Sequence, residues 1–201
     1  DFSYEVSRSL AACESALLLV DASQGIQAQT ISNTKKALEL GLKLIPVLNK
    51  IDLPNINIEE REKEIESLLG FSKDEIIKVS GKTGEGVDKL LDAVITQSPR
   101  PLGDFNKPLK ALVFDSFYDE HRGVVIAVRI FDGKYTYKPG KTDELYMIQR
   151  KQTFKPTEIG IFNPNLQELE TLRAGEVGYI ATGMKDISFF TVGDTISDQK
   201  N

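Results

Sequence analysis

The sequence predicts an α/β domain, with a parallel sheet and flanking helices, followed by an antiparallel β-barrel domain. In the first half, short apolar runs alternate with segments of helical periodicity, a pattern typical of a parallel sheet. Residues 98–103 are then rich in proline and glycine and show no periodicity, which indicates a domain boundary. Beyond them, short segments with a period of two are separated by turn residues, as in an antiparallel barrel.

Composition and charge limit the classes of protein that this sequence can encode. With 201 residues, 40% of them hydrophobic, the chain is long enough for one large or two small domains. The formal charge of −5 argues against broad nonspecific binding to nucleic acid, although a local basic face is compatible with it. We expect no membrane span, because no apolar run approaches the roughly 20 residues that cross a bilayer. We also expect no signal or transit peptide, because the first residues, Asp-Phe-Ser-Tyr, have the pattern of neither.

The single cysteine and the single histidine exclude several kinds of site. Cys13 has no partner for an internal disulfide and falls among apolar positions of the first helix. We therefore expect a reduced core residue, with a reactive thiol as the alternative. Because His121 is the sole histidine, a zinc site built from cysteines and histidines is excluded, and so is any mechanism that requires two histidines.

Helical and extended segments alternate through the first half. The second helix pattern places Ile31, Ala37 and Leu38 inward and ends at Gly41, which suits a left-handed cap. The expected elements are a helix at 3–13, a strand at 15–20, a helix at 28–40, a strand at 44–49, a helix after Asn57, a strand at 76–79 and a helix at 87–94.

The helix after Asn57 combines a cap, an apolar stripe and an acidic face. Asn57 can cap it together with Glu60, three positions later. The acidic residues alternate with Arg61 and Lys63, and adjacent helix positions do not converge on one ion, so we expect a solvated face rather than a metal site. The expected buried stripe is Ile58, Ile65, Leu68 and Leu69, and the expected acidic face is Glu59, Glu60, Glu62, Glu64 and Glu66.

The most informative stretch is the apolar run that begins at Leu44 and ends in a polar tip. Asn49, Lys50 and Asp52 follow it, and open α/β sheets bind ligands beyond the carboxyl ends of their strands. The Asp52 carboxylate can accept two parallel hydrogen bonds from N1 and the exocyclic amino group of guanine, a pair that adenine does not offer. Asn49 can tie this loop to its neighbours or reach the base edge, and the stem of Lys50 can lie on the ring. The alternative is a strand that ends in common polar residues by chance.

Ser80, Gly81 and Lys82 form a second polar tip, after the next apolar segment. The backbone N–H of Gly81 could donate to guanine O6, and Lys82 could cover the ring face opposite Lys50. An ordinary strand-to-helix loop is the alternative, since these residue types are common there. Two such tips on neighbouring strands predict a clamp for a guanine base.

Composition divides the chain into residues 1–99, a linker at 100–107 and a barrel at 108–201. We expect barrel strands at 109–114, 123–131, 144–148, 158–162 and 175–181. In the second of these, one face carries Val124, Ile126, Val128 and Ile130, and the other carries Val125, Ala127 and Arg129.

Three stretches, together with the two polar tips, give the chain a resemblance to a known family. They are DFSYEVSRSLAACE at 1–14, FDSFY at 114–118 and AGEVGY at 174–179. The chain resembles the translational GTPases and, more narrowly, the elongation factor 4 (LepA) family. The resemblance covers nearly the whole chain, from the later half of a GTPase domain through the barrel that follows it.

This resemblance implies a ribosome-dependent GTPase that acts on translocation and binds GTP or GDP with Mg²⁺. It implies that the barrel touches the RNA of the small ribosomal subunit. The tip at Asn49, Lys50 and Asp52 matches the family's base-specificity motif, and the tip at 80–82 matches its second base loop. Gly81 stands where the family usually has alanine; because the contact comes from a backbone N–H, this should affect flexibility more than hydrogen bonding.

The resemblance also sets expectations about location and partners. It implies the cytoplasm, or the matrix or stroma of a mitochondrion or plastid, no DNA partner and a monomeric state. Peripheral membrane association stays open.

The parts that handle phosphate are missing from this sequence. No G-x-x-x-x-G-K-[ST] string occurs, and the family's Asp-x-x-Gly-His segment would lie upstream of Asp1. We therefore identify no catalytic residue and no metal ligand, and expect this chain alone to be inactive. The alternative is a noncatalytic RNA- or protein-binding module. An unrelated α/β enzyme fused to a barrel lacks support, because no Ser/His/Asp set, paired-carboxylate site or G-x-G-x-x-G loop is present.

Overall fold

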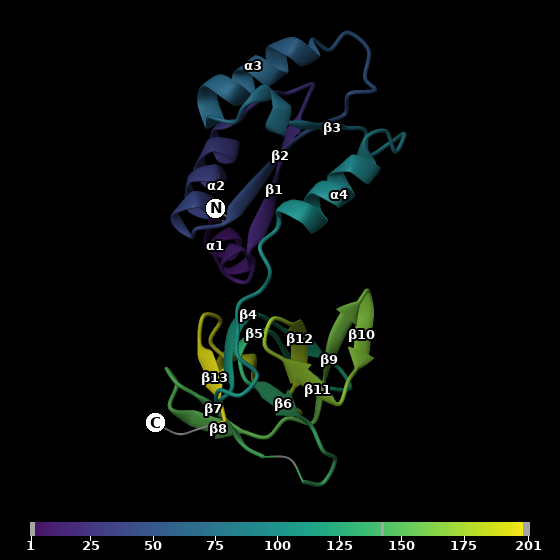
Figure 1. Cartoon of the computed structure of the whole chain (residues 1–201). Coiled ribbons are helices and arrows are strands. Elements are labelled where there is room, and N and C mark those ends of the chain that lie inside the picture. The colour runs from purple at the N-terminus through teal and green to yellow at the C-terminus, as the bar shows by residue number, and fades with distance from the viewer. Residues whose placement is uncertain (1–2, 142, 199–201) are drawn as a thin grey trace. The chain divides into compact units, whose positions relative to one another are not determined.

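The computed structural model describes residues 3–141 and 143–198, and the chain divides into two compact units, residues 1–100 and 101–201 (Figure 1). In the first unit, a parallel sheet has the strand order β1-β2-β3, which confirms the predicted fold class. Its elements are α1 (Ser3–Ala11), β1 (Ser15–Asp21), α2 (Ala28–Glu39), β2 (Lys43–Asn49), α3 (Ile58–Leu69), η1 (Lys73–Glu75), β3 (Ile77–Val79) and α4 (Val87–Gln97).

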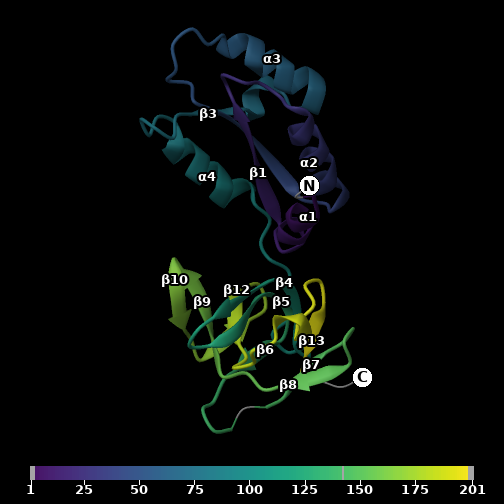
Figure 2. The ribbon, with the colours of Figure 1, turned by 180° about the vertical axis from the view of Figure 1, so that it is seen from behind.

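Helices cover both faces of this sheet. Ile65 of α3 packs with Leu48 of β2 on one face, where α2 also lies. On the other face, Leu90 and Val94 of α4 pack against Ile45. Figure 2 shows α2 and α3 on one side of the strands and α4 on the other. The central strand β2 is therefore buried on both sides, which explains its nearly continuous apolar sequence.

Local sequence signals set the ends of the helices. The Asn57 side chain accepts a hydrogen bond from the Glu60 N–H at 3.2 Å, which confirms the predicted cap of α3. Gly41 follows α2 with φ of +75°, and Gly70 ends α3 with φ of +78°. Both glycines take the left-handed conformation that side chains disfavour.

Three expectations about burial are wrong. Leu38 and Leu68 are 56% and 54% exposed, and Cys13 is exposed rather than part of the core. Leu38 directly follows Ala37, a buried position of α2, and Leu68 comes three positions after Ile65, a buried position of α3. Both leucines therefore lie at the edge of a narrow buried stripe. Cys13 lies beyond the end of α1, in the turn to β1, where the helical pattern no longer applies.

Glu62 is also not on the expected solvated face, since its side chain is only 2% exposed. Its carboxylate accepts hydrogen bonds from Lys78 Nζ at 2.6 Å and from Lys73 Nζ at 3.0 Å. Burial by itself would raise the pKa of Glu62, but the two lysines more than offset it and hold the pKa below its ordinary value. The pair fastens α3 to β3 and η1.

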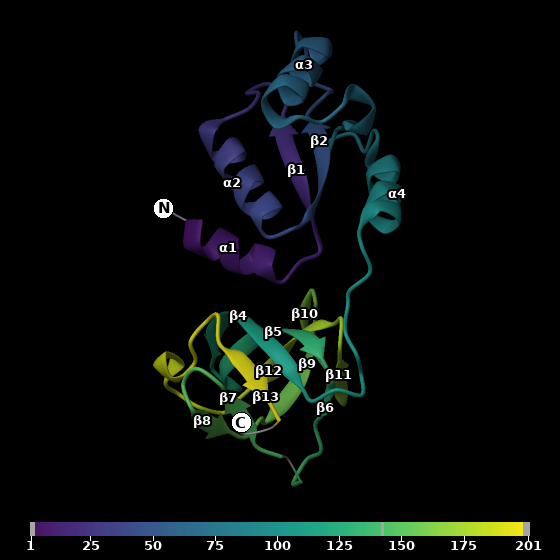
Figure 3. The same cartoon turned by 60° about the vertical axis from the view of Figure 1, so that its left-hand side comes forward.

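The second unit is an antiparallel β-barrel, as predicted. Its main sheet has the order β10-β9-β12-β5-β4-β13-β7-β8, and β11 pairs with β6 (Figure 3). The elements are β4 (Lys110–Asp119), β5 (Gly123–Asp132), β6 (Lys134–Thr136), β7 (Leu145–Met147), β8 (Gln152–Phe154), β9 (Glu158–Asn163), β10 (Asn165–Glu168), β11 (Thr171–Arg173), β12 (Val177–Ala181), η2 (Ile187–Phe189) and β13 (Thr195–Ser197).

The two faces of β5 pack into different apolar clusters, as its alternation predicts. Val124 and Ile126 belong to the main core of the barrel, whereas Val125 packs with Tyr179 of β12. Gly160 makes room for that ring, because a Cβ at this position would lie 2.6 Å from it. Among the described residues, no helix has the length and apolar character needed to cross a membrane.

We predict that Glu62→Gln lowers the free energy of unfolding at pH 7 by about 1.5–3 kcal/mol, because it removes charge-assisted hydrogen bonds from a buried site. The depressed pKa stabilises the fold above the ordinary pKa of 4.5, and this contribution is lost as the pH falls through the folded-state value. Urea titrations should therefore show the difference from wild type shrinking below about pH 4.5. Glu66→Gln, on the exposed face of α3, is the control; an equal loss at acid pH would contradict the role of Glu62.

Candidate functional site

The carboxyl ends of the three parallel strands meet at one edge of the sheet. Asn49, the last residue of β2, is in register with Asp21 of β1 and with Val79 of β3. The residues that follow these strands therefore begin side by side. Figure 3 shows β1 and β2 running in the same direction toward this edge.

The Asn49 side chain joins the two predicted tips. Its Oδ1 accepts hydrogen bonds from the Lys50 N–H at 2.8 Å and from the Gly81 N–H at 3.1 Å. Both bonds use the oxygen, so the Nδ2 group keeps its donors and has no partner among the residues that the structure describes. Asn49 thus joins the two loops, and it lines the pocket between them.

Ser80 supports Asp52 from behind. The Ser80 side chain is fully buried, and its Oγ donates to Asp52 Oδ1 at 2.6 Å and accepts from the Thr83 N–H at 3.1 Å. The second carboxylate oxygen of Asp52 has no such bond within the described part of the chain. Ser80 therefore orients the carboxylate and does not itself line the pocket.

The two lysines of the tips have different surroundings. Lys50 has a left-handed backbone, with φ of +66°, and its Nζ lies 2.6 Å from Asp21 Oδ2. The hydrogen bond from Lys50, followed by that from Ser23, lowers the pKa of Asp21 to about 2, so this carboxylate is ionised under all ordinary conditions. Lys82 is exposed. Asp21 was not among the predicted site residues, although its position directly after a buried strand was a usable signal.

A pocket of about 260 Å³ lies between the tips. Because pockets for drug-sized ligands span roughly 300–1,000 Å³, this one suits a single ring system better than a whole nucleotide. Leu53, which the sequence analysis did not single out, adds an apolar contact. The lining residues are Asn49, Lys50, Asp52, Leu53, Gly81 and Lys82.

The hydrogen bond made by the Gly81 N–H differs from the one predicted from the sequence. The Gly81 N–H, which we expected to be available for guanine O6, donates to Asn49. A bound base would have to share this donor with Asn49 or displace it. A Cβ added at Gly81 would lie 3.8 Å from Asn49 Oδ1, which is an ordinary van der Waals contact. The space around this position therefore does not require glycine.

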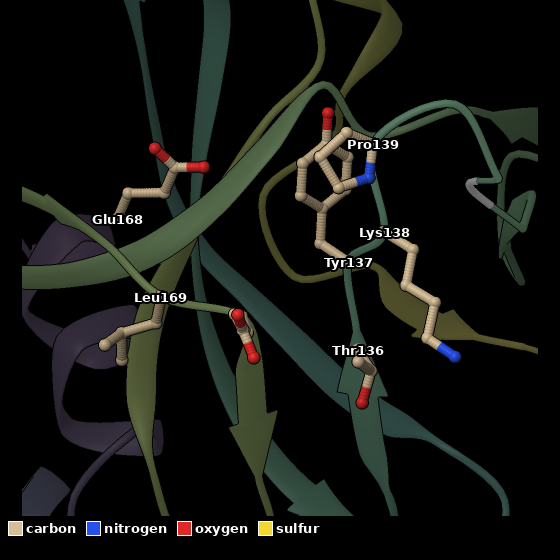
Figure 4. A pocket seen from close by; sticks show the side chains of 7 residues that line it. Thr136, Tyr137, Lys138, Pro139, Glu168 and Leu169 are labelled. Atoms are coloured by element: carbon tan, nitrogen blue, oxygen red, sulfur yellow. The ribbon is translucent and has the colours of Figure 1, made fainter.

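A larger pocket, of about 540 Å³, lies in the barrel and has a different character (Figure 4). Its lining includes the ring of Tyr137 and the carboxylates of Glu168 and Glu170. Lys138 also lines it, so two carboxylates and one ammonium group leave a net negative charge, which disfavours phosphate groups, and none of the predicted site residues lies there. Size alone therefore does not identify the nucleotide site, and the charges favour the smaller pocket.

Comparisons with known proteins agree with this fold and site. A family model described as the elongation factor Tu GTP binding domain matches residues 1–100. Together with the parallel sheet and its two joined tips, this match defines the first unit as part of a GTP-binding domain of the elongation-factor class.

Individual relatives narrow the class. The chain is 52% identical over 197 residues to elongation factor 4 of Thermotoga maritima, 50% over 201 to that of Aquifex aeolicus and 51% over 198 to that of Lactobacillus acidophilus. These alignments cover 98%, 100% and 98% of this chain, and 31%, 33% and 32% of the relatives. The chain belongs to the elongation factor 4 family, and it spans about a third of the length of the relatives that it matches.

We predict that Asn49→Ala loosens both tips, because the Lys50 and Gly81 N–H groups lose their acceptor. At about 0.5–1.5 kcal/mol for a hydrogen bond, exchange of these two amide hydrogens should become up to about tenfold faster. Amide hydrogen exchange by NMR is the measurement. Asn49→Asp keeps an acceptor oxygen and should retain most of the protection; equal acceleration in both variants would show that the side chain does not hold the loops.

Proposed function

We propose that this chain supplies the guanine-recognition half of a ribosome-associated GTPase, together with one ribosome-facing barrel. The observation that carries the proposal is the joined pair of tips. Asp52 is held by buried Ser80, Asn49 is bonded to Gly81, and a pocket sized for a base lies between them. The membership of the elongation factor 4 family supports the same conclusion.

In this proposal each side chain has a defined contact with guanine. Asp52 accepts hydrogen bonds from N1 and the 2-amino group, since one of its oxygens still lacks a partner among the described residues. Asn49 Nδ2 donates to the base edge. The stems of Lys50 and Lys82 cover the two faces of the ring, and Gly81 shares its N–H with O6. Polar pairing at a ring edge gives strong selectivity, because the wrong base leaves buried groups unpaired.

The sheet of the first unit has a free edge that supports a larger domain in the full-length protein. β1 pairs with β2 alone within the described chain, and its Leu17 and Leu19 are 46% and 57% exposed. They are in register with Ile45 and Val47, so they share the face that α4 covers. We propose that residues preceding this chain add a parallel strand and a helix there, with the phosphate-binding loop between them.

The chemistry of hydrolysis then depends on the rest of the protein. Phosphoryl transfer needs positioned cations and N–H donors around the γ-phosphate, and Mg²⁺ supplies much of this charge when it is bound. The chain contributes no residue that we assign to the metal. Its part is to bind and orient the base, which fixes where the phosphates lie.

We propose that the barrel contacts ribosomal RNA, and the charge of its β7–β8 hairpin supports this. Arg150 and Lys151 are exposed in the turn of this hairpin, and the exposed Lys155 directly follows β8. In the β4–β5 turn, by contrast, Arg122 is paired with Asp119 and Glu158. Basic side chains bind phosphates without reading sequence. The relatives named above are bacterial proteins, so the proposed site of action is the ribosome of the bacterial cytoplasm.

We predict that Asp52→Asn in the full-length protein lowers the affinity for GDP by about 100-fold or more, since two charge-assisted hydrogen bonds are each worth about 1.5–3 kcal/mol. The asparagine amide can donate to the 2-keto group of xanthine, so the Asp52→Asn variant should bind xanthosine diphosphate more tightly than the wild-type protein does. Isothermal titration calorimetry measures both. Asp92→Asn, at an exposed position of α4, is the control, and an unchanged preference for guanine in Asp52→Asn would refute the clamp.

We also predict that the 201-residue chain hydrolyses no GTP, even with saturating GTP, Mg²⁺ and ribosomes, because it lacks donors for the transferred phosphoryl group. The full-length protein should hydrolyse GTP under the same conditions. Release of inorganic phosphate is the measurement. GTP hydrolysis by the 201-residue chain would contradict the proposal that it binds only the base. Inactivity of both proteins would favour the alternative, a noncatalytic binding module.

A further inference from the structure

Asp21 is a charged residue beside the tips that has no role in the proposed base pairing. It ends β1 directly beside Asn49, and the Ala22 N–H donates to the Asn49 carbonyl at 2.9 Å. Its two carboxylate oxygens have separate partners. Oδ1 accepts from the Ser23 N–H at 2.8 Å and from the Ser23 hydroxyl at 2.6 Å, while Oδ2 lies 2.6 Å from Lys50 Nζ. Oδ1 therefore stabilises the turn at Ser23, and Oδ2 forms the ion pair with Lys50.

Lys50 is held at both ends of its length. Its backbone N–H donates to Asn49 Oδ1, which stabilises a left-handed backbone that a lysine seldom adopts. Its ammonium group is held by Asp21. The four-carbon stem between these two points lines the base pocket, although the side chain is 50% exposed. A half-exposed lysine without such an anchor would sample many rotamers.

We propose that Asp21 is a positioning residue of the base pocket, which fixes the Lys50 stem as a preformed wall for one face of the purine. The inference rests on the proposed guanine site and adds a role that the base-pairing residues do not have. Packing against a ring face does not distinguish the exocyclic groups of the base. Asp21 therefore sets how tightly any purine nucleotide is held, whereas Asp52 sets which purine is preferred.

The test compares variants of the full-length protein by calorimetric titration with GDP and with inosine diphosphate, which lacks the 2-amino group. Asp21→Asn keeps the size of the side chain and an acceptor for Ser23 but removes the charge that holds Lys50. An exposed ion pair is worth little, so we expect both nucleotides to bind about two- to fivefold more weakly, with the ratio between them unchanged. Asp52→Asn should instead change the ratio.

Two further variants separate positioning from a merely structural role. Ser23→Ala removes the turn contact of Asp21 and leaves the contact with Lys50, so it should bind GDP like wild type. Lys50→Met keeps an apolar stem without the ammonium group, and adding Asp21→Asn to it should have no further effect. Equal weakening by Ser23→Ala and Asp21→Asn would overturn the proposal, as would tighter or unchanged binding by folded Asp21→Asn. Absence of guanine preference in the wild-type protein would instead refute the guanine site itself.

Discussion

The position of Asn49 in the parallel ladder is the constraint on which the candidate site depends. Hydrogen bonding of β2 to both neighbours places its last residue beside Asp21 and beside Val79. From there the Asn49 amide oxygen accepts hydrogen bonds from the N–H groups of Lys50 and Gly81. Gly81 lies 32 positions after Asn49 in the sequence. A shift of the register by one residue would turn every β2 side chain to the other face of the sheet and move Asn49 away from Gly81, so this junction depends on the observed register.

Buried charge supports the same arrangement from a distance. Glu62 holds Lys78 of β3, and so α3 and β3 keep a fixed relation on the face opposite α4. Ser80 follows two residues later, fully buried beneath Asp52. The loops at the pocket are short and are bonded to rigid elements, which suits a site that must present a carboxylate and an amide in one orientation. The cost of burying Glu62 is offset by two lysines that remain partly hydrated.

Periodicity predicted the elements well and predicted burial less well. The parallel sheet, the Asn57 cap and the two-faced strand β5 followed from residues close together in the sequence. Leu38, Leu68 and Cys13 were assigned to the core and are exposed, and Glu62 was assigned to solvent and is buried. A helical stripe defines which positions share a side of a helix, but the width of the contact depends on what packs against it. The short strands β6, β8, β10, β11 and β13 carry too few residues for a clear period.

The sequence by itself determined which polar residues follow the strands, because an apolar run and the residues directly after it lie close together in the chain, and these residue types led to the proposed guanine site. Only the tertiary structure decided how these residues are held. Asn49 takes the Gly81 N–H, Ser80 stands behind Asp52, and Lys50 is anchored by Asp21. These bonds join residues about 30 positions apart, and their partners are chosen by the register of the sheet and the direction of each side chain, which no short stretch of sequence contains.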